Sequence, residues 1–67
     1  MNKELCDKLN VLPIDDRKKY KKELDIVFSD KVYAARNYGM SREEYNDPTQ
    51  EIKEKYEEII YNKMFGN

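Results

Sequence analysis

The sequence predicts an all-α fold, a small bundle of four or five short helices in a single domain over residues 1–67. Apolar residues recur every three or four positions along most of the chain, which is the spacing of one helix face. Capping residues, prolines and glycines divide these runs, and no β-hairpin signal is present. A chain this short buries only about 60% of its unfolded surface. We therefore expect close helix packing or self-association to stabilise it, because one cysteine cannot form an internal disulfide.

The first helix is expected over residues 2–10. Three leucines at i, i+4 and i+7 would form its apolar face: Leu5, Leu9 and Leu12. Pro13 disfavours helical backbone at the residue before it, and Asn10 suits a helix end. Cys6 lies beside the leucines. We interpret it as a small core residue, because the chain has no histidine to activate a thiol.

Residues 14–37 have a helical pattern whose apolar stripe contains Tyr20, Leu24, Val27, Phe28, Ala35 and Tyr38. Lys31 would fall in the middle of this stripe if the helix were continuous. The conflict disappears if the chain breaks near Ser29 and this serine caps a second helix over residues 30–38. We favour the break.

Gly39 is expected to end that helix. Ser41 and Glu44 have the spacing of a capping box, which predicts another short helix beginning after Ser41. Pro48 follows closely, so this helix is expected to end near Asn46.

The final helix is expected between Asp47 and Gly66. Asp47 would cap its first turn, Pro48 would take the first helical position, and Gly66 would end it in a left-handed conformation. One apolar stripe lies between these signals, formed by Ile52, Tyr56, Ile59, Ile60 and Met64.

Aromatic residues are frequent, with six tyrosines and two phenylalanines. On the final helix Tyr61 and Phe65 lie at i and i+4, opposite the middle of the main stripe. Tyr33 is expected to point away from Ala35 and Tyr38. Since tyrosine suits interfaces, we predict a protein interface at Tyr33, Tyr61 and Phe65, with a second copy of the chain or a larger host protein as partner. The alternative is that five packed helices enclose both apolar faces.

Residues 17–22 read Arg-Lys-Lys-Tyr-Lys-Lys, a run with five basic residues. Such a run is typical of a surface that contacts phosphate groups or an acidic partner. The alternative is a solvated helix face, neutralised at i,i+4 spacing by Lys19 with Glu23 and Lys21 with Asp25.

Residues 29–47 resemble a helix-turn-helix. That motif has a small residue where its helices touch, a glycine four positions later, then an apolar residue, a polar cap and a further apolar residue. The matching positions are Ala35, Gly39, Met40, Ser41 and Tyr45. The second helix departs from the pattern, because one basic and two acidic residues begin it and Pro48 cuts it short.

The resemblance implies DNA binding, which is the alternative function. It would use the basic run 17–22 and the corner 35–45, with phosphate contacts from Lys18, Lys19, Lys21, Lys22, Arg36 and Arg42. The acidic residues after position 40 are interpreted as solvated helix faces. A third interpretation is that they mimic a phosphate array for a DNA-binding enzyme.

Several function classes are not expected. The chain lacks histidine, and its only glycines are Gly39 and Gly66, so we predict no enzyme activity, no cofactor, no metal site and no small-molecule substrate. We expect no membrane span, and a single thiol suits the cytoplasm. The abundance of Lys, Asn, Tyr and Ile fits an AT-rich genome, such as that of a phage or mobile element. The predicted function is a small intracellular interaction module, a modulator or adaptor.

Overall fold

The computed structural model describes residues 3–66, and this part of the chain consists of five helices without a strand. The predicted all-α bundle is therefore confirmed. In chain order the helices are α1 Lys3–Asn10, α2 Ile14–Ser29, α3 Lys31–Tyr38, α4 Arg42–Asn46 and α5 Gln50–Phe65. Residue 2 of the predicted first helix lies outside the described residues.

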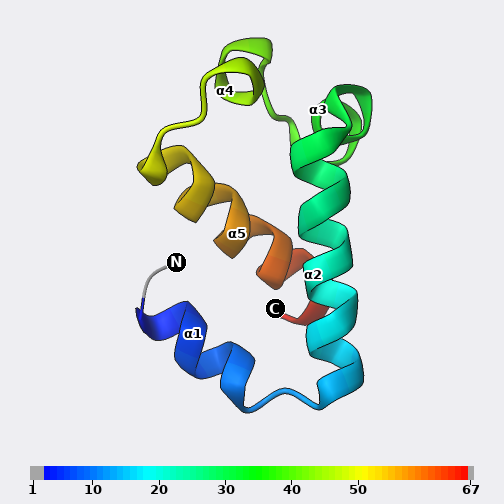
Figure 1. Ribbon diagram of the computed structural model, residues 1–67, viewed down its shortest axis with the longest axis vertical. Coiled ribbons are helices and arrows are strands. Elements are labelled where there is room, and N and C mark those ends of the chain that lie inside the picture. Colours follow the sequence, from blue (N-terminus) through cyan, green and yellow to red (C-terminus); the bar gives the residue numbers. More distant parts are fainter. Residues whose placement is uncertain (1–2, 67) are drawn as a thin grey trace.

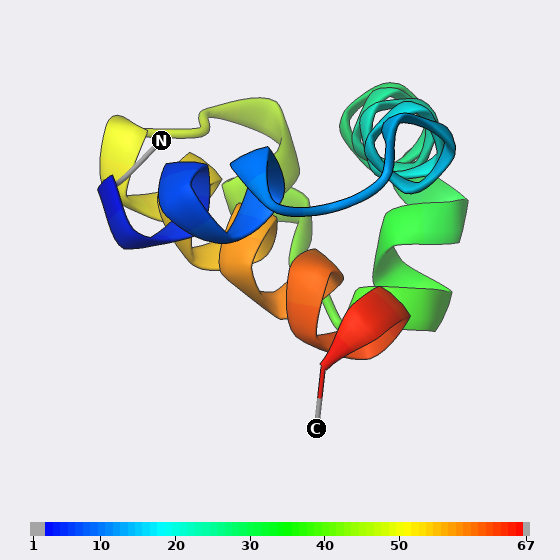
Figure 2. The same ribbon diagram turned by 90° about the horizontal axis from the view of Figure 1, so that it is seen from below.

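The two long helices, α2 and α5, have 16 residues each and pack against one another. α5 runs obliquely through the molecule, and its C-terminal end passes behind α2 (Figure 1). α3 continues from the upper end of α2, and α4 leads back to the start of α5. Viewed from below, α1 and α2 stand apart with α5 lying between and beneath them (Figure 2). α1 contacts α5 where Lys8 Nζ lies 5.7 Å from the Tyr61 ring centroid, and Leu9 of α1 packs against the core.

The core is one cluster of buried side chains drawn from α2, α3, the α3–α4 corner and α5. Its members are Tyr20, Val27, Ala34, Met40, Tyr56 and Ile60. Val27 and Ile60 are fully shielded from solvent. At about 25 cal/mol per Å² of apolar area, burial of such side chains is the main source of stability in a chain this small.

The break in the middle segment is confirmed, but the cap is one residue later than expected. Asp30 has an extended backbone and its carboxylate accepts a hydrogen bond from the Tyr33 N–H at 3.1 Å. The hydroxyl of Ser29, the predicted cap, instead donates to the carbonyl of Asp25. Ser29 remains the last residue of α2.

This shift changes which small residue enters the core. Ala34 is fully buried, whereas Ala35, expected at the helix contact, is exposed. The reason is that the prediction continued the helical spacing of α2 across the break into α3, whereas the break shifts which residues of α3 face the core. Tyr33 was also expected to point away from Tyr38, but the two ring centroids lie 6.4 Å apart.

The α3–α4 corner follows the predicted design. Gly39 takes a left-handed conformation at φ 68° and its N–H donates to the Ala35 carbonyl at 3.1 Å. Met40 then turns into the core. The capping box is confirmed, because the hydroxyl of Ser41 accepts from the Glu44 N–H and the Glu44 carboxylate accepts from the Ser41 N–H.

Both ends of α5 differ from the prediction. Thr49 caps the helix by accepting from the Ile52 N–H at 3.2 Å, so Asp47 is not the cap and Pro48 precedes the helix. Threonine is among the preferred cap residues, although aspartate ranks above it, and Pro48 lies next to the cap in either case. Gly66 has an extended conformation at φ −101° rather than a left-handed one.

Candidate functional site

The lysines of the basic run lie on the solvent-facing side of α2. Lys18, Lys19, Lys21 and Lys22 are all exposed. Between residues 3 and 66 the only ion pair joins Lys55 and Glu44 at 3.3 Å, so these lysines form no direct ion pair at i,i+4 spacing within that range. The carboxylate of Glu23 is instead the acceptor for the hydroxyls of Tyr33 and Tyr38, at 2.7 and 2.6 Å.

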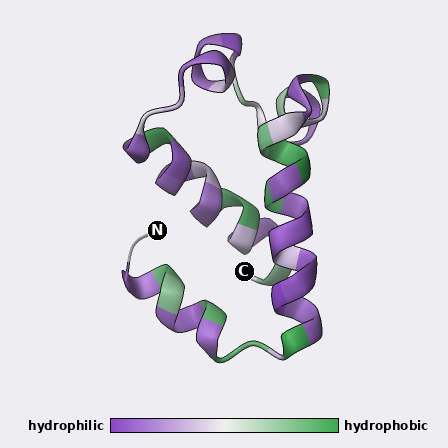
Figure 3. Cartoon of the chain, in the orientation of Figure 1, coloured by the Kyte–Doolittle hydropathy of each residue, from purple (hydrophilic) through white to green (hydrophobic). Residues whose placement is uncertain are grey.

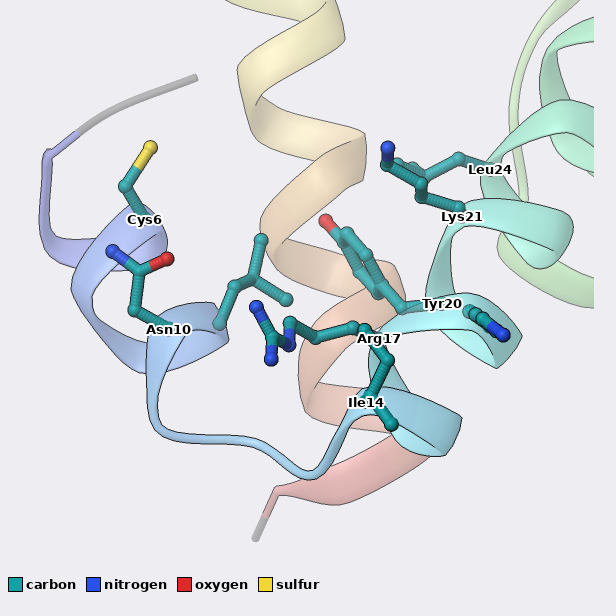
Figure 4. A pocket seen from close by; sticks show the side chains of 9 residues that line it. Cys6, Asn10, Ile14, Arg17, Tyr20, Lys21 and Leu24 are labelled. Carbon is teal, nitrogen blue, oxygen red and sulfur yellow. The ribbon is translucent and has the colours of Figure 1, made fainter.

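A hollow of about 550 Å³ lies between α1 and α2. Its apolar lining comes from both helices and consists of Leu9, Ile14, Tyr20 and Leu24. Cys6 and Asn10 line it on the α1 side, and three cations line it on the α2 side: Arg17, Lys18 and Lys21. Figure 4 shows that the hollow is bounded by α1 on one side and α2 on the other, with α5 behind.

Arg17 is one of the three cations that line this hollow. Its side chain extends from α2 toward α1 (Figure 4). The Nε atom is buried and has no hydrogen-bond partner within residues 3–66. A buried donor without an acceptor costs about 1–3 kcal/mol. This Nε is therefore enclosed by the protein itself, while other atoms of Arg17 line the hollow.

Tyr20 forms part of the hollow and is fixed by the rest of the fold. Its hydroxyl donates to the carbonyl of Glu57 at 2.8 Å, which joins α2 to α5. Burial raises the pKa of Tyr20 well above its usual value, so the phenol stays neutral. The hollow is thus backed by a neutral tyrosine that is itself buried.

The predicted interface residues lie in two different aromatic clusters. Tyr61 and Phe65 pack behind Tyr20, with ring centroids 6.1 and 6.4 Å from its own. Tyr33 belongs to the second cluster, with Tyr38 and Glu23, and the hydrogen bond to Glu23 raises the pKa of Tyr33. All three predicted residues are half-buried. The structure therefore gives each an internal contact and does not bring them together into one aromatic face.

An exposed apolar corner adjoins the hollow. Val11 in the α1–α2 linker and Ile14 at the start of α2 expose 82% and 56% of their surface. The hydropathy colouring shows this corner as a green stretch at the base of α2 (Figure 3). Because Ile14 also lines the hollow, the corner and the hollow form one continuous surface. We name this surface, Val11 together with the lining of the hollow, the α1–α2 groove.

The sequence-based prediction missed this groove. It depends on α1 standing away from α2, which no local pattern encodes. The signal that could have indicated it is the pair of apolar residues, Val11 and Ile14, around Pro13 in a linker where polar residues are usual.

The residues expected to contact DNA phosphate are all exposed, on three helices: Lys18, Lys19, Lys21 and Lys22 on α2, Arg36 on α3 and Arg42 on α4. α4 has only five residues and carries Glu43 and Glu44 in its first turn. Arg42 is thus the one basic residue of the would-be recognition helix.

No family model, curated protein or solved structure matches the chain. Within residues 3–66, no group of three or more Cys, Asp or Glu side chains is arranged to hold a metal ion. Among the helices that the structure describes, none is long and apolar enough to cross a membrane.

Proposed function

We propose that this chain is a small protein-binding module that holds a segment of another protein in the α1–α2 groove. The observation that supports the proposal is an apolar hollow of about 550 Å³ whose lining also includes three cations, Arg17, Lys18 and Lys21. Protein interfaces combine an apolar centre with a polar rim, and arginine and tyrosine are enriched where binding energy concentrates.

The charge of the groove favours a different protein over a second copy of the chain. In a symmetric dimer through this surface, each protomer would present the same three cations, Arg17, Lys18 and Lys21, to its partner. Like charges brought together in an interface oppose association. The self-association expected from the sequence is therefore a competing outcome that the test below includes.

The test compares one groove substitution with a matched substitution elsewhere. Peptides from a displayed random library are selected on the wild-type protein and measured against Ile14→Asp and Val32→Asp. Both residues are apolar and exposed, at 56% and 60%, but Val32 is on α3 and does not line the hollow. An aspartate suits the first turn of α2, so Ile14→Asp is expected to fold.

We expect the selected peptides to bind Val32→Asp like the wild type and to lose about tenfold or more in affinity for Ile14→Asp, because an apolar contact becomes a charge that must lose water. Equal binding to both variants would mean that the groove is not the site. Sedimentation velocity of the free protein tests self-association, and a dimer abolished by Ile14→Asp would make a second copy the partner.

A second candidate function is binding to the phosphate backbone of DNA. It is supported by the four exposed lysines of α2, which have no acidic partner within the described residues. Anisotropy of labelled duplex DNA at two salt concentrations tests it. Phosphate binding should weaken steeply with salt, with a slope of about −0.9 per phosphate contact. Ile14→Asp should leave DNA binding nearly unchanged, which separates the two candidates.

A further inference from the structure

The α1–α2 groove continues along α2 into a second hollow. This second hollow has about 560 Å³ and is lined in part by Phe28 of α2, Tyr45 of α4 and Pro48. Leu24 lines both hollows. The α2 residues on this side recur at helical spacing from Ile14 through Leu24 to Phe28, so they lie on one face of the helix. Because Leu24 lines both, the two hollows adjoin along α2, and we treat them as one extended groove.

The dimensions of the extended groove fit a helix. From Ile14 to Phe28 it follows α2 for about 20 Å, at a rise of 1.5 Å per residue, which is the length of a helix of about 14 residues. The walls are helices, and residues 3–66 contain no strand to which an extended peptide could add. Grooves between helices take amphipathic helices that insert apolar residues at i, i+3, i+4 and i+7.

The charge of the extended groove changes sign along its length. The first hollow is lined by the cations Arg17, Lys18 and Lys21 and by no acidic residue. The second hollow is lined by two acids and one base: Asp25, Glu57 and Lys53. A partner that complements both ends needs acidic side chains at one end and neutral or basic side chains at the other.

We infer that the partner segment is an amphipathic helix of about 14 residues that places its acidic end over Arg17 and its other end over the second hollow. This inference rests on the proposed function. A carboxylate from the helix would accept from the guanidinium of Arg17, which lines the first hollow. Arginine binds carboxylates through two parallel hydrogen bonds, which a lysine cannot do.

Two synthetic peptides of identical composition test the inference. Each has about 14 residues, leucines at helical spacing and a hydrocarbon staple on the polar face that keeps it helical. The first has glutamates along one half and lysines along the other. The second has the same glutamates and lysines interleaved. We expect the first peptide to bind the wild-type protein about tenfold tighter in fluorescence anisotropy, because only its charges match both ends of the groove.

Substitutions on α2 provide the matched controls. Arg17→Gln and Lys19→Gln each remove one positive charge, but only Arg17 lines the groove. We expect Arg17→Gln to weaken binding of the first peptide about tenfold or more and Lys19→Gln to change it less than about twofold. Arg17→Lys keeps the charge without the planar fork and should fall between them. Circular dichroism verifies that each variant folds.

Each other outcome overturns the inference in a distinguishable way. Equal affinity for the two peptides, lost in Ile14→Asp, would reject the charge pattern and leave the proposed function standing. If neither synthetic peptide binds while the library peptides still lose affinity for Ile14→Asp, the result would reject the helical partner but not the proposed function. If no peptide of any kind depends on Ile14, the proposed function fails with it. If Arg17→Gln and Lys19→Gln weaken binding to duplex DNA equally, these cations contact DNA phosphate groups and not a protein helix.

Discussion

The hydroxyl of Tyr56 donates a 2.7 Å hydrogen bond to Oε1 of Glu44, the same oxygen that accepts the backbone N–H of Ser41. Lys55 Nζ lies 3.3 Å from the other carboxylate oxygen. Glu44 therefore completes the capping box of α4 and joins α4 to α5. These donors lower the pKa of Glu44 to about 2, with the Ser41 N–H as the largest cause and the Tyr56 hydroxyl next.

Acid is expected to destabilise the protein through Glu44. Because its pKa is lower in the folded state, the unfolded chain binds the proton more readily. The stabilisation is present above the ordinary pKa of 4.5 and is lost as the pH falls toward about 2. In Glu44→Gln no charge is left to titrate at this position. Melting temperatures measured between pH 7 and pH 2 should therefore fall more steeply for the wild type than for this variant.

Glu43→Gln is the control for this prediction, since Glu43 lies beside Glu44 but makes none of these contacts. Its melting temperature should follow the wild-type curve through the same pH range. If Glu44→Gln also follows that curve, the hydrogen bonds to Glu44 do not contribute to the acid sensitivity.

The caps show how much the sequence could predict. The capping box at Ser41 and the stop at Gly39 were predicted correctly, because a single candidate residue satisfied each local rule. At Ser29–Asp30 and at Asp47–Thr49 two suitable caps lie close together, and the local sequence does not choose between them. In the structure Asp30 and Thr49 are the caps, and the register of α3 follows from the cap at Asp30. The α1–α2 groove depends on packing to a still greater extent.

Tyr61 and Phe65 are expected to stabilise the fold as well as any interface. Their ring centroids are 5.4 Å apart, and both rings pack against the buried ring of Tyr20. The double substitution to alanine should cost about 2–4 kcal/mol in free energy of unfolding, because Tyr20 loses its neighbours. At about 4–8 °C per kcal/mol, thermal melting followed by circular dichroism will detect it.

The exposed Val32 supplies the comparison, and Val32→Ala should melt close to the wild type. The sequence alone predicts a different result for the double variant: an intact helical signal with loss of association or partner binding. A wild-type melting temperature together with lost peptide binding would therefore assign these rings to an interface and remove them from the core.

Gly39 is predicted to tolerate side chains according to their backbone preference. A Cβ at this position would meet no atom within 4 Å, so steric clash does not contribute. The left-handed conformation at φ 68° remains costly for alanine, by about 1–2 kcal/mol, and less so for asparagine. The free energy of unfolding measured by urea denaturation should therefore be highest for the wild type, lower for Gly39→Asn and lowest for Gly39→Ala. Equal stability of the two variants would show that the backbone can relax at this corner.

Cys6 offers a direct measurement of groove occupancy. It lines the hollow on the α1 side, is half-buried, and is the only cysteine in the chain. A bound helix would cover the thiol. The peptide with glutamates along one half and lysines along the other should therefore, at saturation, slow labelling by a thiol-reactive dye about tenfold, in proportion to the fraction of free protein. In Ile14→Asp the same peptide concentration should leave the labelling rate nearly unchanged, because the groove stays empty. Unchanged labelling of the wild type with peptide bound would place the peptide on another surface, away from α1.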